Sequence, residues 1–157
     1  MPIRQALNRL AFDRLVQDIP QRGYILRTVS FSEAVAAFRL RELLETEAAG
    51  EAARRITDAE IEILKRVIGV EGDIVLRNYT FHLTVARISG NRLLADFVEE
   101  LLMLTQCLIV NHPQVIAMDY DQEMKIIDAL ATRDPETARA AMRKHIQISV
   151  EQMVNNH

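Results

Sequence analysis

The sequence predicts an all-α protein, in which an antiparallel bundle of about six helices follows a short segment of different character. From residue 30 onward, apolar residues recur at helical spacing, each boundary carries a helix start or stop signal, and no convincing strand pattern occurs. The 157 residues are 49% hydrophobic and carry a formal net charge of -3. They can therefore fill the core of one domain and are not expected to be disordered.

The first 29 residues predict an amphipathic helix and a hairpin. Apolar residues at helical spacing predict a helix over residues 2–15, and its polar side carries Arg4, Gln5, Asn8 and Arg9. Two short strands then flank a turn at residues 20–23, with Arg22 at its tip. A helix followed by a basic two-stranded wing is the second half of a winged helix-turn-helix, and a docking arm packed on the main body is the alternative.

Charge divides the chain in the same place. Residues 1–30 hold five arginines and two acids, or +3, whereas residues 31–157 hold 14 basic and 20 acidic residues, or -6. A basic segment on an acidic body suits a polyanion such as DNA. A transit peptide is also rich in arginine, but the strand, turn and strand that follow Arg14 argue against one.

The body of the chain predicts helices near residues 31–54, 58–69, 71–88, 92–111, 118–132 and 135–155. Two capping boxes mark helix starts, and they consist of Ser30 with Glu33 and of Thr57 with Glu60. Asp134 followed by Pro135 marks another start, and Gly90 ends one helix before Asn91 caps the next. Short connections make neighbouring helices antiparallel.

The single cysteine and the absence of a long apolar run predict a soluble cytoplasmic protein. Cys107 can form neither an intramolecular disulfide nor a thiolate zinc cluster, and its leucine-rich surroundings predict a buried side chain. No uncharged apolar run approaches the roughly 20 residues of a membrane-spanning helix, and the start of the chain lacks the apolar core of a signal peptide. We expect no association with a membrane.

Taken together, these segments resemble the GntR family of bacterial transcription regulators, in the FadR-type branch with a C-terminal FCD ligand-binding domain. Residues 1–10 resemble its recognition helix, and Arg22-Gly23 lie where its wing turns. The body matches in order through residues 39–45, Phe81-His82, residues 88–91, residues 126–130, Asp134 and residues 138–145. The resemblance covers essentially the whole chain.

The resemblance implies two parts with different tasks. Residues 1–29 would be the C-terminal part of a winged-helix DNA-binding domain, and residues 30–157 an effector-binding and dimerisation domain. The implied protein is a homodimer that contacts a double-stranded DNA operator through Arg4, Gln5, Asn8, Arg9 and Arg22. The family's DNA-binding domain begins two helices earlier, so we expect either a longer native protein or a segment that has lost DNA binding, and favour the first.

Family members commonly bind a divalent metal through an aspartate four residues before a histidine and through two later histidines. Carried over to this sequence, the pattern implies His82 and His145 as ligands, with Asn78 in place of the aspartate and Glu123 in place of the remaining histidine. Two histidines and one carboxylate suit zinc, nickel, iron or manganese. The alternative is a metal-free interior in which the histidines are ordinary buried residues or pair with Glu123.

The resemblance also implies that Arg41 faces an effector pocket, where its guanidinium can grip the carboxylate of a small organic acid through two parallel hydrogen bonds. A pair with Glu45, four residues later on the same helix, is the alternative. His112 and His157 are most simply solvated.

These observations predict an effector-responsive transcription regulator and not an enzyme. The sequence contains no glycine-rich phosphate loop, no His-Glu-x-x-His and no nucleophile elbow. Two alternatives remain at this point. One is a metal or metabolite sensor that does not bind DNA, and the other is a metalloenzyme that uses His82, Glu123 and His145.

Overall fold

The computed structural model describes residues 2–12, 16–111 and 120–156. Within these ranges the elements are α1 (Pro2–Phe12), β1 (Val16–Ile19), β2 (Gly23–Leu26), α2 (Phe31–Ala53), α3 (Asp58–Gly69), α4 (Ile74–Ile88), α5 (Arg92–Asn111), α6 (Tyr120–Ala131) and α7 (Pro135–Asn155). The six helices from α2 to α7 confirm the predicted all-α body. His112, His157 and the last three residues of the first predicted helix lie outside the described residues.

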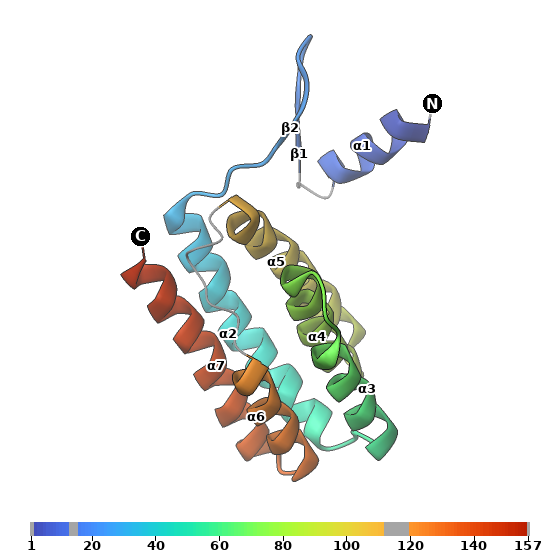
Figure 1. The fold of residues 1–157 in the computed structure, drawn as a ribbon, viewed down its shortest axis with the longest axis vertical. Coiled ribbons are helices and arrows are strands. Elements are labelled where there is room, and N and C mark those ends of the chain that lie inside the picture. The colour runs from blue at the N-terminus through green and yellow to red at the C-terminus, as the bar shows by residue number, and fades with distance from the viewer. Residues whose placement is uncertain (1, 13–15, 112–119, 157) are drawn as a thin grey trace.

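Helix α2 occupies the middle of the bundle and packs against α4, α5, α6 and α7 (Figure 1). Helix α3 packs on α4 and α6, and α6 in turn packs on α7. Gly50 on α2 leaves room for the side chain of Arg139 on α7, because a Cβ atom there would lie 2.6 Å from the guanidinium carbon of Arg139. That guanidinium lies across α2 and donates two hydrogen bonds to Glu47, at 3.1 and 3.2 Å.

Two groups of buried apolar side chains form the core. The larger joins all of the helices from α2 to α7, and includes Phe38, Leu64, Phe81, Ile126 and Met142. The smaller lies between α2, α4 and α5, and includes Ala48, Leu83, Ala86, Val98 and Leu102. Cys107 belongs to the larger group and is buried as predicted, and burial raises the pKa of its thiol.

The predicted starts of α2, α3 and α7 are confirmed, with one difference between the two capping boxes. The Thr57 hydroxyl accepts from the Glu60 amide at 3.3 Å, and the Glu60 carboxylate accepts from the Thr57 amide at 2.8 Å, so this box is complete. Ser30 accepts from the Glu33 amide at 3.2 Å. The Glu33 carboxylate is bound instead by Arg27, so the first box is only half formed.

The other boundary signals behave in the same local way. Asp134 accepts from the Thr137 amide at 2.9 Å, and Pro135 follows it in the first turn of α7. Gly90 ends α4 with a φ of 73°, a left-handed conformation that favours glycine, and Asn91 then caps α5.

The predicted helix over 71–88 begins three residues later than expected. Its N-cap is Asp73, whose carboxylate accepts from the amides of Val75 and Leu76 at 2.9 and 3.1 Å. Gly72, with a φ of 141°, precedes it in a conformation outside the helical region. A carboxylate that satisfies two of the first free amides fixes the helix start more strongly than apolar spacing does.

The N-terminal segment forms the predicted helix and antiparallel hairpin, in which Val16 pairs with Leu26 and Ile19 with Gly23. Helix α1 packs on β1, and Figure 1 shows both beyond the end of the bundle where α2 begins. The Tyr24 hydroxyl on β2 donates a hydrogen bond to Asn8 on α1. No helix in the described part of the chain is long and apolar enough to cross a membrane.

Candidate metal and effector site in the bundle

A connected group of polar side chains lies inside the bundle, where apolar residues would be expected. Arg41 and Glu45 reach it from α2, His82 from α4, and Thr105 from α5, and all four are buried. His145 joins them from α7 and is partly buried. Because these helices are distant in sequence, the group exists only in the folded bundle.

Glu45 is the centre of this group, because each of its carboxylate oxygens has its own partner. Arg41 donates from Nε to Oε1 at 2.6 Å, and Nδ1 of His82 contacts Oε2. Arg41 also donates from Nη1 to the Thr105 hydroxyl at 3.2 Å. The arginine is thereby fixed between two helices, with its guanidinium carbon 4.9 Å from the centre of the Phe38 ring.

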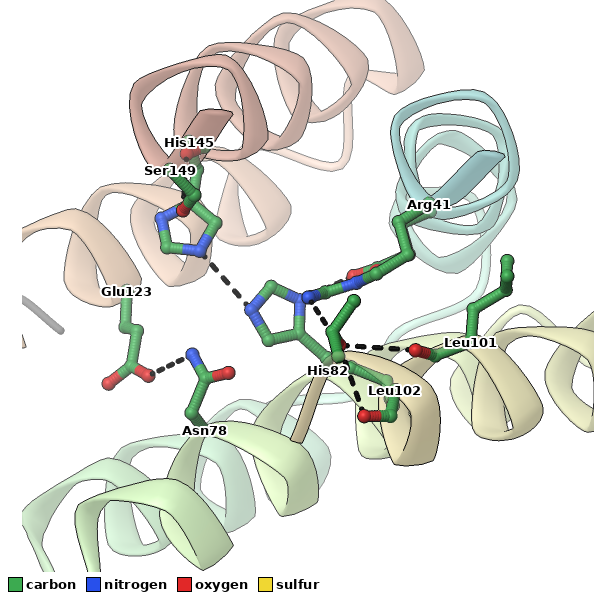
Figure 2. Close-up of polar contacts among 10 residues, drawn as sticks. Arg41, Asn78, His82, Leu101, Leu102, Glu123, His145 and Ser149 are labelled. Carbon is green, nitrogen blue, oxygen red and sulfur yellow. Dashed lines mark hydrogen bonds and ion pairs between the residues drawn. The ribbon is translucent and has the colours of Figure 1, made fainter. Parts of the chain in front are cut away.

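The two histidines meet through their outer ring nitrogens. Nε2 of His82 lies 3.2 Å from Nε2 of His145, and the ring centres are 5.0 Å apart. Figure 2 shows the His82 ring projecting from α4 into the space between Arg41 and His145. Because Nδ1 of His82 faces a carboxylate, its Nε2 is the nitrogen that remains for a ligand or for His145.

Charge and burial shift the ionisation of two members of the group. Burial by itself would raise the pKa of Glu45, but the charges of Arg41 and His82 and their hydrogen bonds outweigh it and lower the pKa to about 2. Burial, together with the charge of His82, lowers the pKa of His145 to about 3. At neutral pH Glu45 is therefore ionised and His145 is neutral, which is the form in which imidazole binds metals.

A second polar pair lies one helical turn from His82. Asn78 on α4 donates from Nδ2 to Oε1 of Glu123 on α6 at 3.3 Å (Figure 2). Oε2 of Glu123 is buried and has no hydrogen-bond partner in the described structure. The nearest cation is Arg77, whose Nε lies 3.6 Å from that oxygen, and this Nε is also buried without a hydrogen bond.

The structure thus arranges the four predicted metal ligands as two contacting pairs, His82 with His145 and Asn78 with Glu123. Asn78 and His82 are one turn apart on α4, as their spacing required. Among the described residues, no three histidine, cysteine or acidic side chains already form a group that could hold a metal ion.

Three residues of this region were not among the predicted site residues, namely the buried Glu45 and Thr105 and the partly buried Arg77. Glu45 entered the sequence analysis only as the alternative partner of Arg41, and the structure shows that pair. Arg77 had no role in the prediction, and its proximity to Glu123 depends on how α4 and α6 face each other. The i,i+4 spacing of Arg41 and Glu45 was the one sequence signal that could have identified Glu45.

The predicted DNA contacts lie outside the bundle, on α1 and at the tip of the hairpin (Figure 1). Arg4, Gln5, Asn8, Arg9 and Arg22 are all exposed. The side-chain oxygen Oδ1 of Asn8 accepts a hydrogen bond from the Tyr24 hydroxyl, which ties the helix to the hairpin. Gln21 and Gly23, on either side of Arg22, have positive φ angles of 65° and 89°, and so turn the chain tightly at the tip.

A bundle of this architecture, preceded by a basic helix and hairpin, defines a class of protein: transcription regulators in which a helical domain follows a DNA-contacting segment. The model of the FCD domain family matches residues 36–148. The chain belongs to this family, and its relatives place it among the GntR-type transcription regulators.

Two curated relatives illustrate the likeness. The chain is 24% identical over 161 residues to the Nta operon transcriptional regulator of Aminobacter aminovorans, which covers 98% of this chain and 77% of the relative. It is 27% identical over 158 residues to the HTH-type transcriptional repressor RspR of Escherichia coli, covering 93% of this chain and 69% of the relative.

Solved structures share the fold. The chain superposes on E. coli McbR/YncC with a TM-score of 0.80 at 19% identity, covering 98% of this chain and 84% of that one. The named relatives are transcription regulators rather than enzymes, which confirms the expectation that this chain is not an enzyme and removes the support for a metalloenzyme.

Proposed function

We propose that the chain is part of a homodimeric, DNA-binding transcription regulator whose helical domain senses a small organic acid through a divalent metal. The observation that carries the DNA-binding part is the exposed polar face of α1 together with the exposed Arg22 at the hairpin tip. A helix that presents Arg4, Gln5, Asn8 and Arg9 can place them against base edges, while the hairpin tip meets backbone phosphate. Paired operator half-sites call for a two-fold protein.

The test of DNA binding compares two arginine variants of α1 with one control. We expect Arg4→Ala and Arg9→Ala each to weaken binding to the operator by roughly tenfold or more, the usual cost of a lost base or phosphate contact. Arg92→Ala is a suitable control, because this exposed arginine lies at the start of α5. Fluorescence anisotropy with DNA from the protein's own upstream region measures all three.

Unchanged affinity in both α1 variants would contradict the assignment of α1 as the recognition helix. If the wild-type protein binds organic acid or metal but no DNA under any condition, the sensor without DNA binding replaces the regulator.

The side chains of the bundle fit a divalent metal on two observations. The Nε2 atoms of His82 and His145 are 3.2 Å apart. Two nitrogen ligands that are each about 2.1 Å from one cation lie about 3.0 to 3.4 Å apart, so the histidine pair has the spacing of two neighbouring ligands. Oε2 of Glu123 is a buried carboxylate oxygen without a hydrogen-bond partner. A cation would satisfy both features.

In this proposal His82 and His145 hold the metal through Nε2, Glu123 supplies the carboxylate, and Asn78 supplies its amide oxygen. A bound divalent metal would supply a positive centre to which the carboxylate of an organic acid can bind. A neutral amide attracts a cation less than aspartate does, so metal and acid would strengthen each other's binding. Arg41 would also donate hydrogen bonds to the carboxylate of the acid, as the resemblance implies, in addition to its contacts with Glu45 and Thr105.

Metal analysis of untagged protein, purified without chelator and reconstituted with zinc or nickel, tests the site. We expect about one equivalent per chain in the wild type, and substantially less in His82→Ala, His145→Ala and Glu123→Gln. Glu62→Gln changes an exposed carboxylate paired with Lys65 on α3, and serves as the control that keeps its metal. Less than about a tenth of an equivalent in the wild type, the level of adventitious binding, would contradict the metal site and leave the DNA-binding proposal standing.

A further inference from the structure

Among the buried carboxylates of the described residues, Glu45 is the one that contacts the ring of His82, a proposed metal ligand. It lies at Nδ1, on the opposite side of the ring from the nitrogen that would bind the metal. Its Oε2 contacts Nδ1 of His82, while Nε2 of the same ring faces His145 at 3.2 Å. Glu45 lies on α2, four residues after Arg41, and belongs to none of the helices that carry the proposed ligands.

We infer that Glu45 is a positioning residue for the proposed metal site: its carboxylate keeps the proton of His82 on Nδ1 and so directs Nε2 into the site. This inference rests on the proposed function for the identity of the ligand, but not for the position of the proton. An ionised carboxylate only accepts hydrogen bonds, so the ring nitrogen that faces it must be the one that carries hydrogen. Metal-bound histidines commonly have such a carboxylate partner on the other nitrogen, which fixes the ring and makes the free nitrogen more basic.

The position of the Glu45 carboxylate is itself fixed by Arg41 on the same helix and, through Arg41, by Thr105 on α5. Arg41 donates to Oε1 at 2.6 Å and is held by the Thr105 hydroxyl at 3.2 Å. The side chains of Thr105, Arg41, Glu45, His82 and His145 therefore form one chain of contacts from α5 through α2 and α4 to α7. A change of ring orientation at His82 would break the contact with Glu45, and the loss would be costly because both side chains are buried.

Glu45→Gln makes the inference testable, because it nearly preserves shape while removing one acceptor. The glutamine amide has a single oxygen, and Arg41 is a donor only, so that oxygen is needed by Arg41. The amide nitrogen then faces Nδ1 of His82 and donates to it. We expect the proton of His82 to move to Nε2, the nitrogen that the metal needs.

The first experiment is nitrogen-15 NMR of the histidine rings in chelator-treated protein at mildly alkaline pH, with His82 assigned through His82→Gln. In the wild type we expect protonated Nδ1, and in Glu45→Gln we expect protonated Nε2. Glu42→Gln is the matched control one turn away on α2, because Glu42 is only partly buried and accepts an exposed hydrogen bond from Gln147. A wild-type ring with bare Nδ1 would overturn the inference, and the wild-type spectrum is recorded without metal.

The second experiment measures zinc affinity by competition with a chromophoric chelator. We expect Glu45→Gln to bind zinc about 10- to 100-fold more weakly with unchanged stoichiometry, the usual effect of removing such a partner, and Glu42→Gln to match the wild type. If the wild type binds no zinc, the proposed metal site fails, while the NMR result still decides the role of Glu45. If zinc binds equally well to Glu45→Gln and to the wild type, the positioning role is wrong although the metal site stands. If Glu45→Gln does not fold, the wild-type ring spectrum decides on its own, because protonated Nδ1 supports the inference and bare Nδ1 overturns it.

Discussion

Replacement of Arg41 by methionine should destabilise the bundle strongly, because it leaves Glu45 as a buried charge without its main partner. Arg41 and Glu45 are 4% and 1% exposed at their side chains, and Nε lies 2.6 Å from Oε1. At an effective dielectric constant of about 20, unit charges about 4 Å apart attract by about 4 kcal/mol. Removal of one partner of a buried pair typically costs about 3 to 5 kcal/mol, which agrees with that figure.

Urea unfolding followed by circular dichroism measures this cost as a change in the free energy of unfolding. We expect Arg41→Met to lower it by about 3 to 5 kcal/mol with little change in the slope against urea. The matched control is Arg54→Met, since Arg54 is 55% exposed and pairs with Glu51 three residues away on the same helix. An exposed pair contributes about 0 to 1 kcal/mol, so the control should be nearly neutral.

The double variant Arg41→Met, Glu45→Gln completes the cycle. Because no unpaired charge remains in it, its cost should be smaller than the sum of the two single costs, by about 1 to 3 kcal/mol. The reasoning is refuted if Arg41→Met is no more destabilising than Arg54→Met. Arg41 would then be held only loosely by Glu45, and its guanidinium would be available to an effector as the sequence predicts.

Two further predictions concern stability. The pKa of His145 falls from 6.5 to about 3 on folding and that of Glu45 from 4.5 to about 2, so the unfolded chain binds more protons than the folded one at acid pH. The free energy of unfolding of the protein freed of metal by a chelator should therefore be greatest above pH 6.5 and should fall on acidification. His145 should lower it by up to about 1.4 kcal/mol per pH unit between pH 6.5 and 4.5, and Glu45 should add to the loss below pH 4.5. A His145→Gln variant with the same profile would show that another group is responsible. At the start of α3, Thr57→Ala should lower the free energy of unfolding by about 1 kcal/mol, because it breaks a complete capping box. Thr57→Ser keeps the hydroxyl and should be nearly neutral. Equal losses of stability in the two variants would exclude the capping explanation.

The fold could be predicted from the sequence because its helix boundaries are local. The hydroxyl of Thr57, the carboxylate of Asp134 and the left-handed Gly90 each act within a few residues of their own position. The start of α4 was misplaced because apolar spacing continues back past Asp73, and only the cap shows where the amides are satisfied. The two histidines could be selected from the sequence because Phe81-His82 and the position of His145 match the family pattern. Nothing in the local sequence shows that their rings meet inside the bundle.

The interior role of Glu45 could not be predicted, because α2 reverses the usual relation between polarity and burial. Leu40 and Leu43 are 49% and 68% exposed, whereas Arg41 is 3% exposed. Sequence periodicity places leucines inward and charged residues outward. Helix α2 is surrounded on several sides, so its inward face is decided by the positions of α4, α5 and α7, which no local pattern contains.

The burial of charged residues on α2 costs solvation free energy, and a gain in stability does not explain why the chain buries them. Charged groups lose solvation when they are buried, and a buried ion pair is often no more stabilising than apolar side chains of similar volume. The chain nevertheless buries Arg41, Glu45 and His82 together while leucines on the same helix face solvent. Local rules that a sequence breaks at one place, with compensating contacts around it, typically mark a functional site. The contacts that run from Thr105 to His145 compensate for the burial of charge, because they give each buried charged group a partner. They also leave Nε2 of His82 directed at His145 and not at a carboxylate.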